Sequence, residues 1–298
     1  MEEKRTGFIL TIEEAVRPSR KAEGHPKNEG YTFLRPITQS ARVGKEPSMH
    51  IDLGLNKLQS GGGIEEHFHE YNEEMPIFDH VYYIISGRIR ATIGDAERIV
   101  GADTLIYCPS DVRHSITDVG KGNAKVLRMS GSGEGERMGE AVYSKTPSGD
   151  LGVHNWKLAS TVKLSKMDEK RTGFIMTIAE SKHKGSVQGD SGNQLYSYLR
   201  PNTSIDRIGK EASMHVALDL NKLQPGRFVE AHYGDFGPKK PTFDLIYYVI
   251  SGRIQAIVGD EERTVGADSL VYCPSNVRCS INNIGKELSK VLAISGTE

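Results

Sequence analysis

Short apolar runs that alternate with polar residues are spread along the whole chain, and turns separate them. Residues 89–93 form one such run, a turn follows at 94–97, and residues 98–100 continue the alternation. A period of two, bounded by Gly, Asp, Asn and Pro, is typical of antiparallel strands joined by tight turns. The pattern therefore predicts an all-β fold of many short strands, in a closed or double-sheet form that covers the strand edges.

The pattern occurs twice. Residues 79–94 and 244–259 share most of their apolar and glycine positions at an offset of 165, and the same offset carries residues 31–36 onto residues 196–201. Two segments that share so many positions in register indicate two copies of one fold. The second copy can then serve as an internal control, because residues that the fold needs should recur in it.

A chain of 298 residues suits two domains of about 150 residues, the usual domain size. We predict one domain over residues 1–135 and a second over residues 169–298. The connector between them, residues 136–168, belongs to a stretch rich in Gly, Ser, Lys and Glu that has no counterpart in the repeat. A short helix is expected around residues 136–143.

Composition narrows the class of protein. Lys and Arg number 38 against 39 Asp and Glu, so no charge excess is available to hold a phosphate backbone, and we expect no nucleic-acid partner. No apolar run approaches the roughly 20 residues of a membrane helix, and the first residues lack the apolar core of a signal peptide. We expect a cytoplasmic protein without disulfides, because three cysteines form no disulfide framework.

Three histidines of the first copy are lost from the second. The replacements are His69 by Gly234, His80 by Leu245 and His114 by Cys279. Glycine, leucine and cysteine differ in size and polarity, so packing does not explain the joint loss. A site that only the first copy keeps is the better explanation.

The spacing of these histidines suits a metal. His67 and His69 lie two residues apart on a predicted strand, where a period of two sends both imidazoles to the same face. His80 lies on the next predicted strand and His114 begins a later one. Four imidazoles that meet inside one barrel would hold a divalent transition metal with open positions for water or substrate.

The order of these residues resembles the cupin superfamily. It combines a His-x-His pair, a third ligand seven residues before Gly87, and a later Gly101, Pro109 and His114 in the superfamily's spacing. The resemblance covers both copies, so it implies a bicupin: two tandem barrels of the double-stranded β-helix or jelly-roll type, the second without metal ligands. It also implies association of barrels through their sheets, and hence a homo-oligomer, with a dimer as the expected form.

One feature departs from the cupin pattern. Cupins usually carry a glutamate three or four residues after the His pair and seven before the glycine. Counting forward from His69 gives Glu73 or Glu74, whereas counting back from Gly87 gives His80. We favour His80, because strand register is fixed by the pleat whereas a loop can absorb insertions. Glu74 or Glu73 stays the alternative ligand.

Further residues are candidates for lining the same cavity. Tyr82 shares the inward face of its strand with His80, and Arg35 and Tyr107 come from neighbouring strands. We take Tyr82 and Arg35 as candidate catalytic residues. Arg35 recurs as Arg200, so a structural role is at least as well supported for it.

The expected function is that of a metal-dependent cupin enzyme. Neutral ligands leave a divalent metal its full charge, which favours a small anionic substrate such as an enolate or carboxylate. We expect one divalent transition metal per chain, with Fe or Mn favoured over Zn, Ni, Co or Cu. Dioxygenase-type cleavage is the first expectation, and a non-redox isomerase, hydrolase or lyase is the alternative. A small-molecule-binding or regulatory bicupin without catalysis is the alternative of another class.

Overall fold

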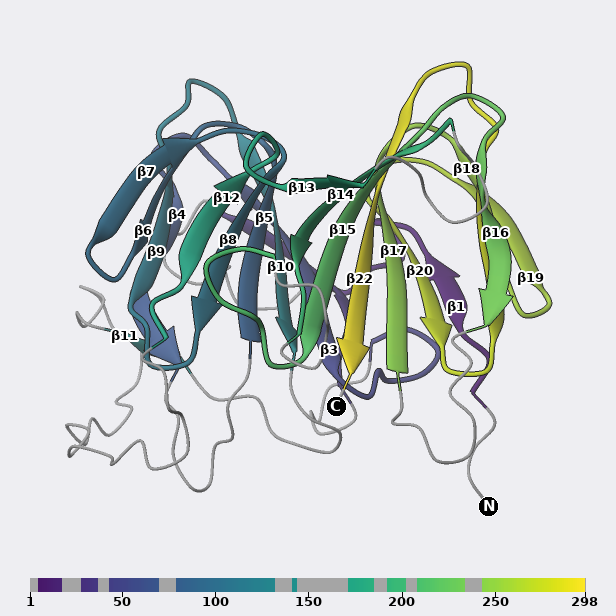
Figure 1. Cartoon of the computed structure of the whole chain (residues 1–298), viewed down its shortest axis with the longest axis horizontal. Coiled ribbons are helices and arrows are strands. Elements are labelled where there is room, and N and C mark those ends of the chain that lie inside the picture. Colours follow the sequence, from purple (N-terminus) through teal and green to yellow (C-terminus); the bar gives the residue numbers. More distant parts are fainter. Residues whose placement is uncertain are drawn as a thin grey trace.

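The computed structural model describes residues 5–17, 28–36, 43–69, 79–131, 141–143, 171–184, 192–201, 208–233 and 243–297. These residues form strands, turns and bends, and the predicted all-β fold is confirmed. Two barrels lie side by side, and each is built from one larger and one smaller sheet (Figure 1). Within the described ranges, no helix is long and apolar enough to cross a membrane.

The first barrel consists of a six-stranded and a five-stranded sheet. In spatial order, the larger sheet contains β12 (Phe174–Thr177), β8 (Thr104–Pro109), β5 (Asp79–Ser86), β10 (Ala124–Gly131), β3 (Ile51–Leu58) and β2 (Glu29–Leu34). The smaller sheet contains β11 (Ala141–Tyr143), β4 (Gly63–His69), β9 (His114–Asp118), β6 (Ile89–Ile93) and β7 (Ala96–Val100).

The second barrel repeats this plan with a seven-stranded and a four-stranded sheet. The larger sheet contains β1 (Phe8–Leu10), β20 (Ser269–Pro274), β17 (Phe243–Ser251), β22 (Ser289–Thr297), β15 (Val216–Leu223), β14 (Gln194–Leu199) and β13 (Lys182–Lys184). The smaller sheet contains β16 (Phe228–Tyr233), β21 (Arg278–Asn283), β18 (Ile254–Val258) and β19 (Glu261–Val265).

The two copies exchange their first strands. β1 lies at the start of the chain but pairs with β20 of the second barrel, with Phe8 opposite Tyr272. β12 belongs to the second copy but pairs with β8 of the first barrel, with Phe174 opposite Tyr107. The division into residues 1–135, 136–168 and 169–298 stays a prediction, and these two strands cross it.

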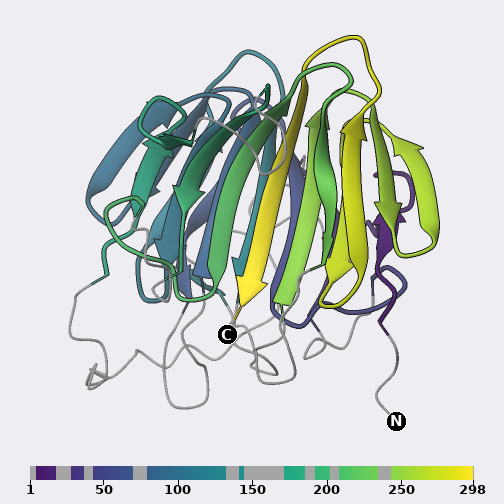
Figure 2. The same ribbon diagram turned by 45° about the vertical axis from the view of Figure 1, so that its right-hand side comes forward.

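Strand alternation gives each large sheet one face toward its own barrel and one toward the other barrel. In β5, Tyr82 and Ile84 join the core inside the first barrel, whereas Val81 and Tyr83 join a core that both barrels share. Leucine, isoleucine and tyrosine residues of β15, β17, β20 and β22 complete that shared core. The large sheets therefore lie back to back between the barrels, as the turned view shows (Figure 2).

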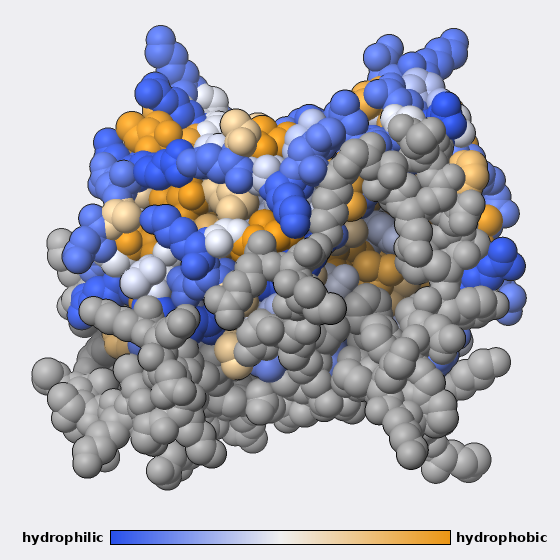
Figure 3. Space-filling view, in the orientation of Figure 1, coloured by the Kyte–Doolittle hydropathy of each residue, from blue (hydrophilic) through white to orange (hydrophobic). Residues whose placement is uncertain are grey.

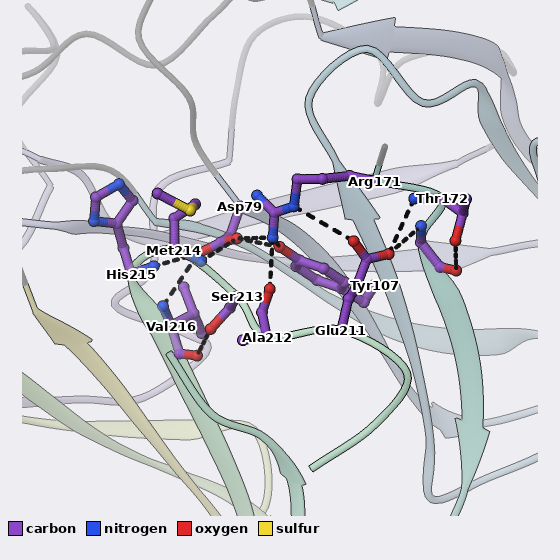
Figure 4. A network of polar contacts seen from close by, with 11 residues as sticks. Asp79, Tyr107, Arg171, Thr172, Glu211, Ala212, Ser213, Met214, His215 and Val216 are labelled. Atoms are coloured by element: carbon purple, nitrogen blue, oxygen red, sulfur yellow. Dashed lines mark hydrogen bonds and ion pairs between the residues drawn. The ribbon is translucent and has the colours of Figure 1, made fainter. Parts of the chain in front are cut away.

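A buried aspartate joins the barrels next to each exchanged strand. Asp79 accepts hydrogen bonds from the backbone N–H groups of Met214 (3.0 Å) and His215 (2.6 Å), and from the Tyr107 hydroxyl (Figure 4). Arg171, just before β12, donates a hydrogen bond to the Tyr107 hydroxyl. Asp244 makes the equivalent contacts in the other copy, so this carboxylate belongs to the duplicated fold rather than to one site.

The prediction of a short helix around residues 136–143 is wrong for its last three residues. Residues 141–143 form β11, which pairs with β4 so that Ala141 lies opposite His69 and Tyr143 opposite His67. The exposed edge of β4 offers unpaired backbone groups, and a strand satisfies them where a helix does not. Residues 132–140 and 144–170 lie outside the described ranges, as do Glu73, Glu74 and Gly234.

The visible surface mixes hydrophilic and hydrophobic residues (Figure 3). Hydrophilic residues project at the upper edge over both barrels, and hydrophobic residues show between them over the left-hand barrel (Figure 3). Among the described residues, the large hydrophobic side chains exposed by more than a third are Val16, Ile99, Phe228 and Ile284. They lie on different elements, as is ordinary for a protein surface.

Candidate metal centre

Four histidines from three strands meet inside the first barrel. β4 supplies His67 and His69, β5 supplies His80 and β9 supplies His114. All four side chains are buried, and one nitrogen of each ring lies within 4.8 Å of the corresponding nitrogens of the others. The structure therefore brings together the four residues that the sequence pattern predicted as ligands.

Hydrogen bonds behind the rings fix which nitrogen faces the centre. His67 Nδ1 lies 2.8 Å from the Glu65 carbonyl oxygen, and His114 Nδ1 lies 2.8 Å from the Val112 carbonyl oxygen. A carbonyl only accepts, so in each neutral ring the proton is on Nδ1 and the lone pair is on Nε2. His80 Nδ1 lies 3.0 Å from Ser130 Oγ, and this hydrogen bond orients the ring, although a hydroxyl that can donate or accept does not fix its tautomer.

Two of the inward-facing nitrogens provide the test of fit for a metal. His80 Nε2 and His114 Nε2 are buried and have no hydrogen-bond partner among the described residues. A buried polar atom that is left unsatisfied costs free energy, so such atoms in a folded protein call for an explanation. A cation bound between them would accept both lone pairs.

Burial keeps these rings neutral. The pKa of His80 lies well below its ordinary value of 6.5, because burial disfavours the charged form and the neighbouring His69 and His114 repel a second charge. Burial and the adjacent His67 lower the pKa of His114 to about 3, although the Val112 carbonyl opposes the shift. Neutral imidazole is the form that binds metals, so His80 and His114 need no proton loss near neutral pH.

The donor set suits a divalent transition metal. Imidazole nitrogens bind Zn, Cu, Fe and Ni well, whereas Mg²⁺ and Ca²⁺ prefer oxygen ligands. Among the residues whose side chains are described, these histidines are the one set of three or more His, Cys, Asp or Glu close enough to hold an ion. The four-histidine group can therefore bind a metal, and its identity and stoichiometry stay predictions.

The candidate catalytic residues lie at different distances from this group. The ring centroid of Tyr82 is 4.7 Å from that of His80 and 6.0 Å from that of His114, so Tyr82 lines the centre. Tyr82 recurs as Tyr247, however, which shows that the fold also keeps a tyrosine at this position. Its catalytic role stays a prediction.

Arg35 lies in an ion pair rather than against the histidines. Its Nη1 is 3.0 Å from Asp52 Oδ2, and the second copy has a similar pair between Arg200 and Asp219 at 2.7 Å. An arginine–aspartate pair thus recurs in the second barrel, where His69, His80 and His114 are replaced, and this recurrence supports a structural role for Arg35. Its proposed catalytic role stays untested.

The expectation that Tyr107 lines the cavity is wrong. In β8, Ile106 and Cys108 point into the first barrel, so the alternation of the strand sends Tyr107 to the opposite face. There its ring joins the core shared by both barrels and its hydroxyl contacts Asp79 (Figure 4). The alternative ligands Glu73 and Glu74 lie outside the described residues, so they stay an alternative to His80.

Sequence reasoning missed three polar residues inside the first barrel. Ser130 holds the His80 ring, and Arg128 Nη2 lies 3.1 Å from Asp52 Oδ1. The repeat contained a signal for two of them, because Arg128 becomes Ala293 and Asp52 becomes Ala217. Neither position is part of the histidine motif, so the motif itself does not indicate them.

The second barrel fills the equivalent positions differently. Leu245 and Cys279 stand where His80 and His114 stand in the first barrel, and both are buried in the apolar interior. All three cysteines of the chain are free and buried, as expected for small core residues. These replacements leave the second barrel with fewer nitrogen donors at this place.

Known proteins resemble part of this chain in sequence. A family model described as the Cupin domain matches residues 54–129, from β3 to β10. The polyketide synthase CurC of Streptomyces cyaneus is 29% identical over 119 residues, which are 40% of this chain and 66% of that protein. The match thus spans just under two thirds of the length of CurC.

Solved structures show the same fold over the whole chain. Oxalate decarboxylase from Bacillus subtilis at pH 4.6 has a TM-score of 0.62 at 18% identity, covering 98% of this chain and 77% of that one. AerE from Microcystis aeruginosa has a TM-score of 0.59 at 13% identity, covering 98% of this chain and 99% of that one. At these identities the likeness shows the fold alone.

Proposed function

Because the chain belongs to the cupin superfamily and has the fold of a bicupin, we propose that it is a metal-dependent enzyme acting on a small oxygenated substrate. The substrate carries enol, keto or carboxylate groups. The observation that carries this proposal is the group of four buried histidines, of which His67, His80 and His114 are held through Nδ1, and of which three are replaced in the second copy. A group with a purely structural role would be expected in both copies.

The charge of the centre selects the substrate class. His67, His69, His80 and His114 would hold the metal, which supplies a Lewis acid whose full charge stabilises negative charge on a substrate oxygen. The bonds to Glu65, Ser130 and Val112 keep the rings in place while the substrate binds.

The surrounding interior strengthens this effect. Ile84, Ile106 and Cys108 are fully buried in the core beside the histidines, so the centre has an apolar wall. Charges interact more strongly there than in water, and an enolate oxygen gains more from a fixed positive charge. Tyr82 lies at the same wall, where it would orient the substrate.

Two reactions share the stabilised enolate. Dioxygenase-type cleavage is the first reaction that we propose, as the sequence pattern led us to expect. Non-redox isomerase, hydrolase or lyase chemistry is the second. The similarity to CurC supports a keto substrate for either reaction, because that relative is described as a polyketide synthase and polyketides are rich in keto groups. Fe or Mn would serve the first reaction, and the oxalate decarboxylase of B. subtilis has Mn(II) centres.

An anaerobic assay separates the two reactions. Metal-loaded protein is incubated with β-diketones, keto acids and phenolic polyketides, with and without dioxygen, and oxygen uptake and products are recorded. Cleavage that stops without dioxygen supports the dioxygenase, whereas turnover under strict anaerobiosis supports the non-redox reaction. Calorimetric binding of these compounds without turnover would overturn the enzyme in favour of a binding protein.

A further inference from the structure

A carboxylate at the end of β9 lies where the second copy has an amide. Asp118 is the last residue of β9, and the repeat replaces it with Asn283 at the end of β21. Both residues are buried, with 1% of Asp118 and none of Asn283 exposed. Aspartate and asparagine have nearly the same shape, but the amide donates hydrogen bonds and the carboxylate only accepts them. The two copies therefore differ here in chemistry rather than in packing.

The backbone holds both side chains in the same way. The N–H of Gly120 donates a hydrogen bond to Asp118 Oδ1 at 2.8 Å. In the second copy, the N–H of Gly285 donates to Asn283 Oδ1 at 3.0 Å. The main-chain carbonyls of the two residues also accept hydrogen bonds from equivalent glycines. The remaining terminal atoms, Oδ2 of Asp118 and Nδ2 of Asn283, thus occupy equivalent places.

In the second copy, this terminal atom joins two segments of backbone. Asn283 Nδ2 donates hydrogen bonds to the carbonyl oxygens of Leu223 at 2.9 Å and Glu287 at 2.8 Å. The equivalent residues of the first copy are Leu58 at the end of β3 and Gly122 in the turn before β10. Equivalent places in the two copies therefore direct Asp118 Oδ2 toward the carbonyl oxygens of these two residues.

Asp118 cannot satisfy these carbonyl oxygens as Asn283 does. Its Oδ2 atom is buried and has no hydrogen-bond partner among the described residues. A carboxylate oxygen and two carbonyl oxygens are all acceptors, so their meeting costs free energy unless a positive charge lies between them. A proton on Oδ2 would serve one of the two carbonyls. A cation contacts all three oxygen atoms.

A hollow on the surface gives access to this place. It is lined by Gly87, Arg88 and residues 119–123, which directly follow Asp118 and include Gly122. Water molecules that enter from this side can complete the coordination of a bound ion. Arg88 and Lys121 are exposed at the hollow, so their positive charges are screened by solvent and weaken the binding of a cation without blocking it.

We propose that Asp118 Oδ2 and the carbonyl oxygens of Leu58 and Gly122 form a site for a hard cation such as Ca²⁺, separate from the four-histidine group. Hard cations take carboxylate, carbonyl and water oxygens, whereas imidazole nitrogens suit transition metals. The ion joins the ends of β9 and β3 to the turn before β10, as the Asn283 amide does in the second barrel. A single carboxylate gives weak binding, with a dissociation constant of about 10⁻⁴ to 10⁻³ M, so the ion leaves when excess metal is removed.

Variants that interchange the two copies test this site. Asp118→Asn copies the second barrel, and Asn283→Asp copies the first barrel. Asp95→Asn is the control, because it removes an exposed carboxylate from the first barrel. Full-length protein is loaded with Zn²⁺ at the histidine group and freed of excess metal. Binding of Ca²⁺ is measured by equilibrium dialysis, and urea unfolding is measured with and without Ca²⁺, Na⁺ or K⁺, while choline chloride keeps the ionic strength constant.

Native protein should bind one Ca²⁺ per chain at this site. At a Ca²⁺ concentration ten times the dissociation constant, the equilibrium constant of unfolding should fall about eleven-fold. Asp118→Asn should neither bind Ca²⁺ nor respond to it, because the amide satisfies both carbonyl oxygens. Asn283→Asp should bind a second Ca²⁺, and Asp95→Asn should behave like the native protein.

An unfolding constant of the native protein that changes with none of the three cations would overturn the inference. The same response in Asp118→Asn as in the native protein would also overturn it. A response to Na⁺ or K⁺ alone supports the oxygen site and assigns it to a monovalent cation. If Asp118→Asn does not fold, Asn283→Asp decides, because the lack of a second bound cation in that variant contradicts the site. The proposed function stands in each case, since none of these oxygen atoms belongs to the histidine group.

Discussion

Single hydrogen bonds behind three of the four imidazole rings, those of His67, His80 and His114, orient the metal centre. The carbonyl oxygens of Glu65 and Val112 each lie two residues before the ring that they hold, so the local course of β4 and β9 orients His67 and His114. In other metal sites, removal of such a hydrogen-bond partner commonly lowers metal affinity by about ten-fold to a hundred-fold. Orientation is thus part of the site as much as the four ligands are.

The role of His80 can be tested by copying the second barrel. His80→Leu should lower metal affinity by roughly a factor of ten or more, because leucine offers no lone pair. The fold should persist, since Leu245 occupies this position in the second copy. Competition with a chelator measures the affinity.

The double variant Glu73→Gln with Glu74→Gln is the control for His80→Leu. It should keep the metal content of the native protein. The reverse result, with metal kept in His80→Leu and lost from the glutamine variant, would make a glutamate the third ligand.

Burial of the histidines predicts a pH dependence for the metal-free protein. His114 has a pKa of about 3 in the fold against an ordinary value of 6.5. The depressed pKa means that its contribution to stability is present above pH 6.5 and is lost as the pH falls toward 3. The free energy of unfolding should fall by about 1.6 kcal/mol between pH 6.5 and 5 from this residue, with a slope that approaches about 1.4 kcal/mol per pH unit toward pH 5.

Urea unfolding of chelator-treated protein at pH 6.5 and pH 5 measures this dependence. The variant His114→Cys, which copies Cys279, should show a smaller loss of stability over the same interval. An equal loss in the variant and in the native protein would show that the titration of other groups is responsible.

At the residue scale, the sequence predicted the four histidines but not the residues that form hydrogen bonds with their rings. The repeat exposed His69, His80 and His114 because their counterparts differ so strongly. Ser130 recurs as Ser295, so the comparison of copies does not distinguish it, although it holds the His80 ring. Hydrogen bonds between strands depend on register, which a single sequence does not contain.

At the scale of elements, the exchanged strands hold the two barrels together. Gly173 precedes β12 and has a φ of +70°, and a Cβ there would lie 2.6 Å from the Tyr107 carbonyl oxygen and 2.7 Å from Ile93 Cγ2. Gly7 precedes β1 with the same φ in the other copy. A glycine at this place lets the segment that leads into each exchanged strand, here called the arm, cross closely over the neighbouring barrel.

Gly173→Ala should therefore destabilise the protein by about 1–3 kcal/mol through backbone strain and overpacking. Metal content should stay at the native level, because no histidine moves with the arm. Thermal and urea unfolding measure the loss, and Gly122→Ala is the control, since that position has open space around its Cβ. Native stability of Gly173→Ala would contradict the account of the arm.

The partners of the strands could not be predicted, although most of the strands could. An alternating apolar segment such as residues 6–12 or residues 172–178 predicts a strand, but a period of two does not specify the sheet that the strand joins. The sequence did not predict β11 for a different reason: the Gly-, Ser- and Glu-rich sequence around it carries no strand pattern. It is the open edge of β4 that supplies its partner.

At the scale of the whole molecule, the two barrels share one core. Tyr83, Leu105 and Met129 of the first barrel belong to the same cluster as Ile246, Tyr248 and Leu292 of the second. Ion pairs that cross between the barrels lie beside this core in symmetric positions, Lys125 with Asp268 and Lys290 with Asp103. The second barrel therefore supports the first, even though it lacks the histidine group.

Residues 1–135 expressed alone should consequently aggregate or unfold at a lower temperature than the full chain. The fragment lacks β12, which leaves the edge of β8 unpaired, and it exposes the shared core to water. Light scattering and thermal unfolding measure both effects. A soluble fragment that is as stable as the full chain would contradict this prediction.

Metal stoichiometry tests the central claim most directly. Full-length protein, loaded with Mn, Fe or Zn and freed of excess metal, is analysed for metal per chain beside the double variant His69→Ala with His114→Ala. The account predicts a value near one for the native protein and near zero for the variant, because the four-histidine group of the first barrel is the site. A value near two, or metal retained by the variant, would contradict it.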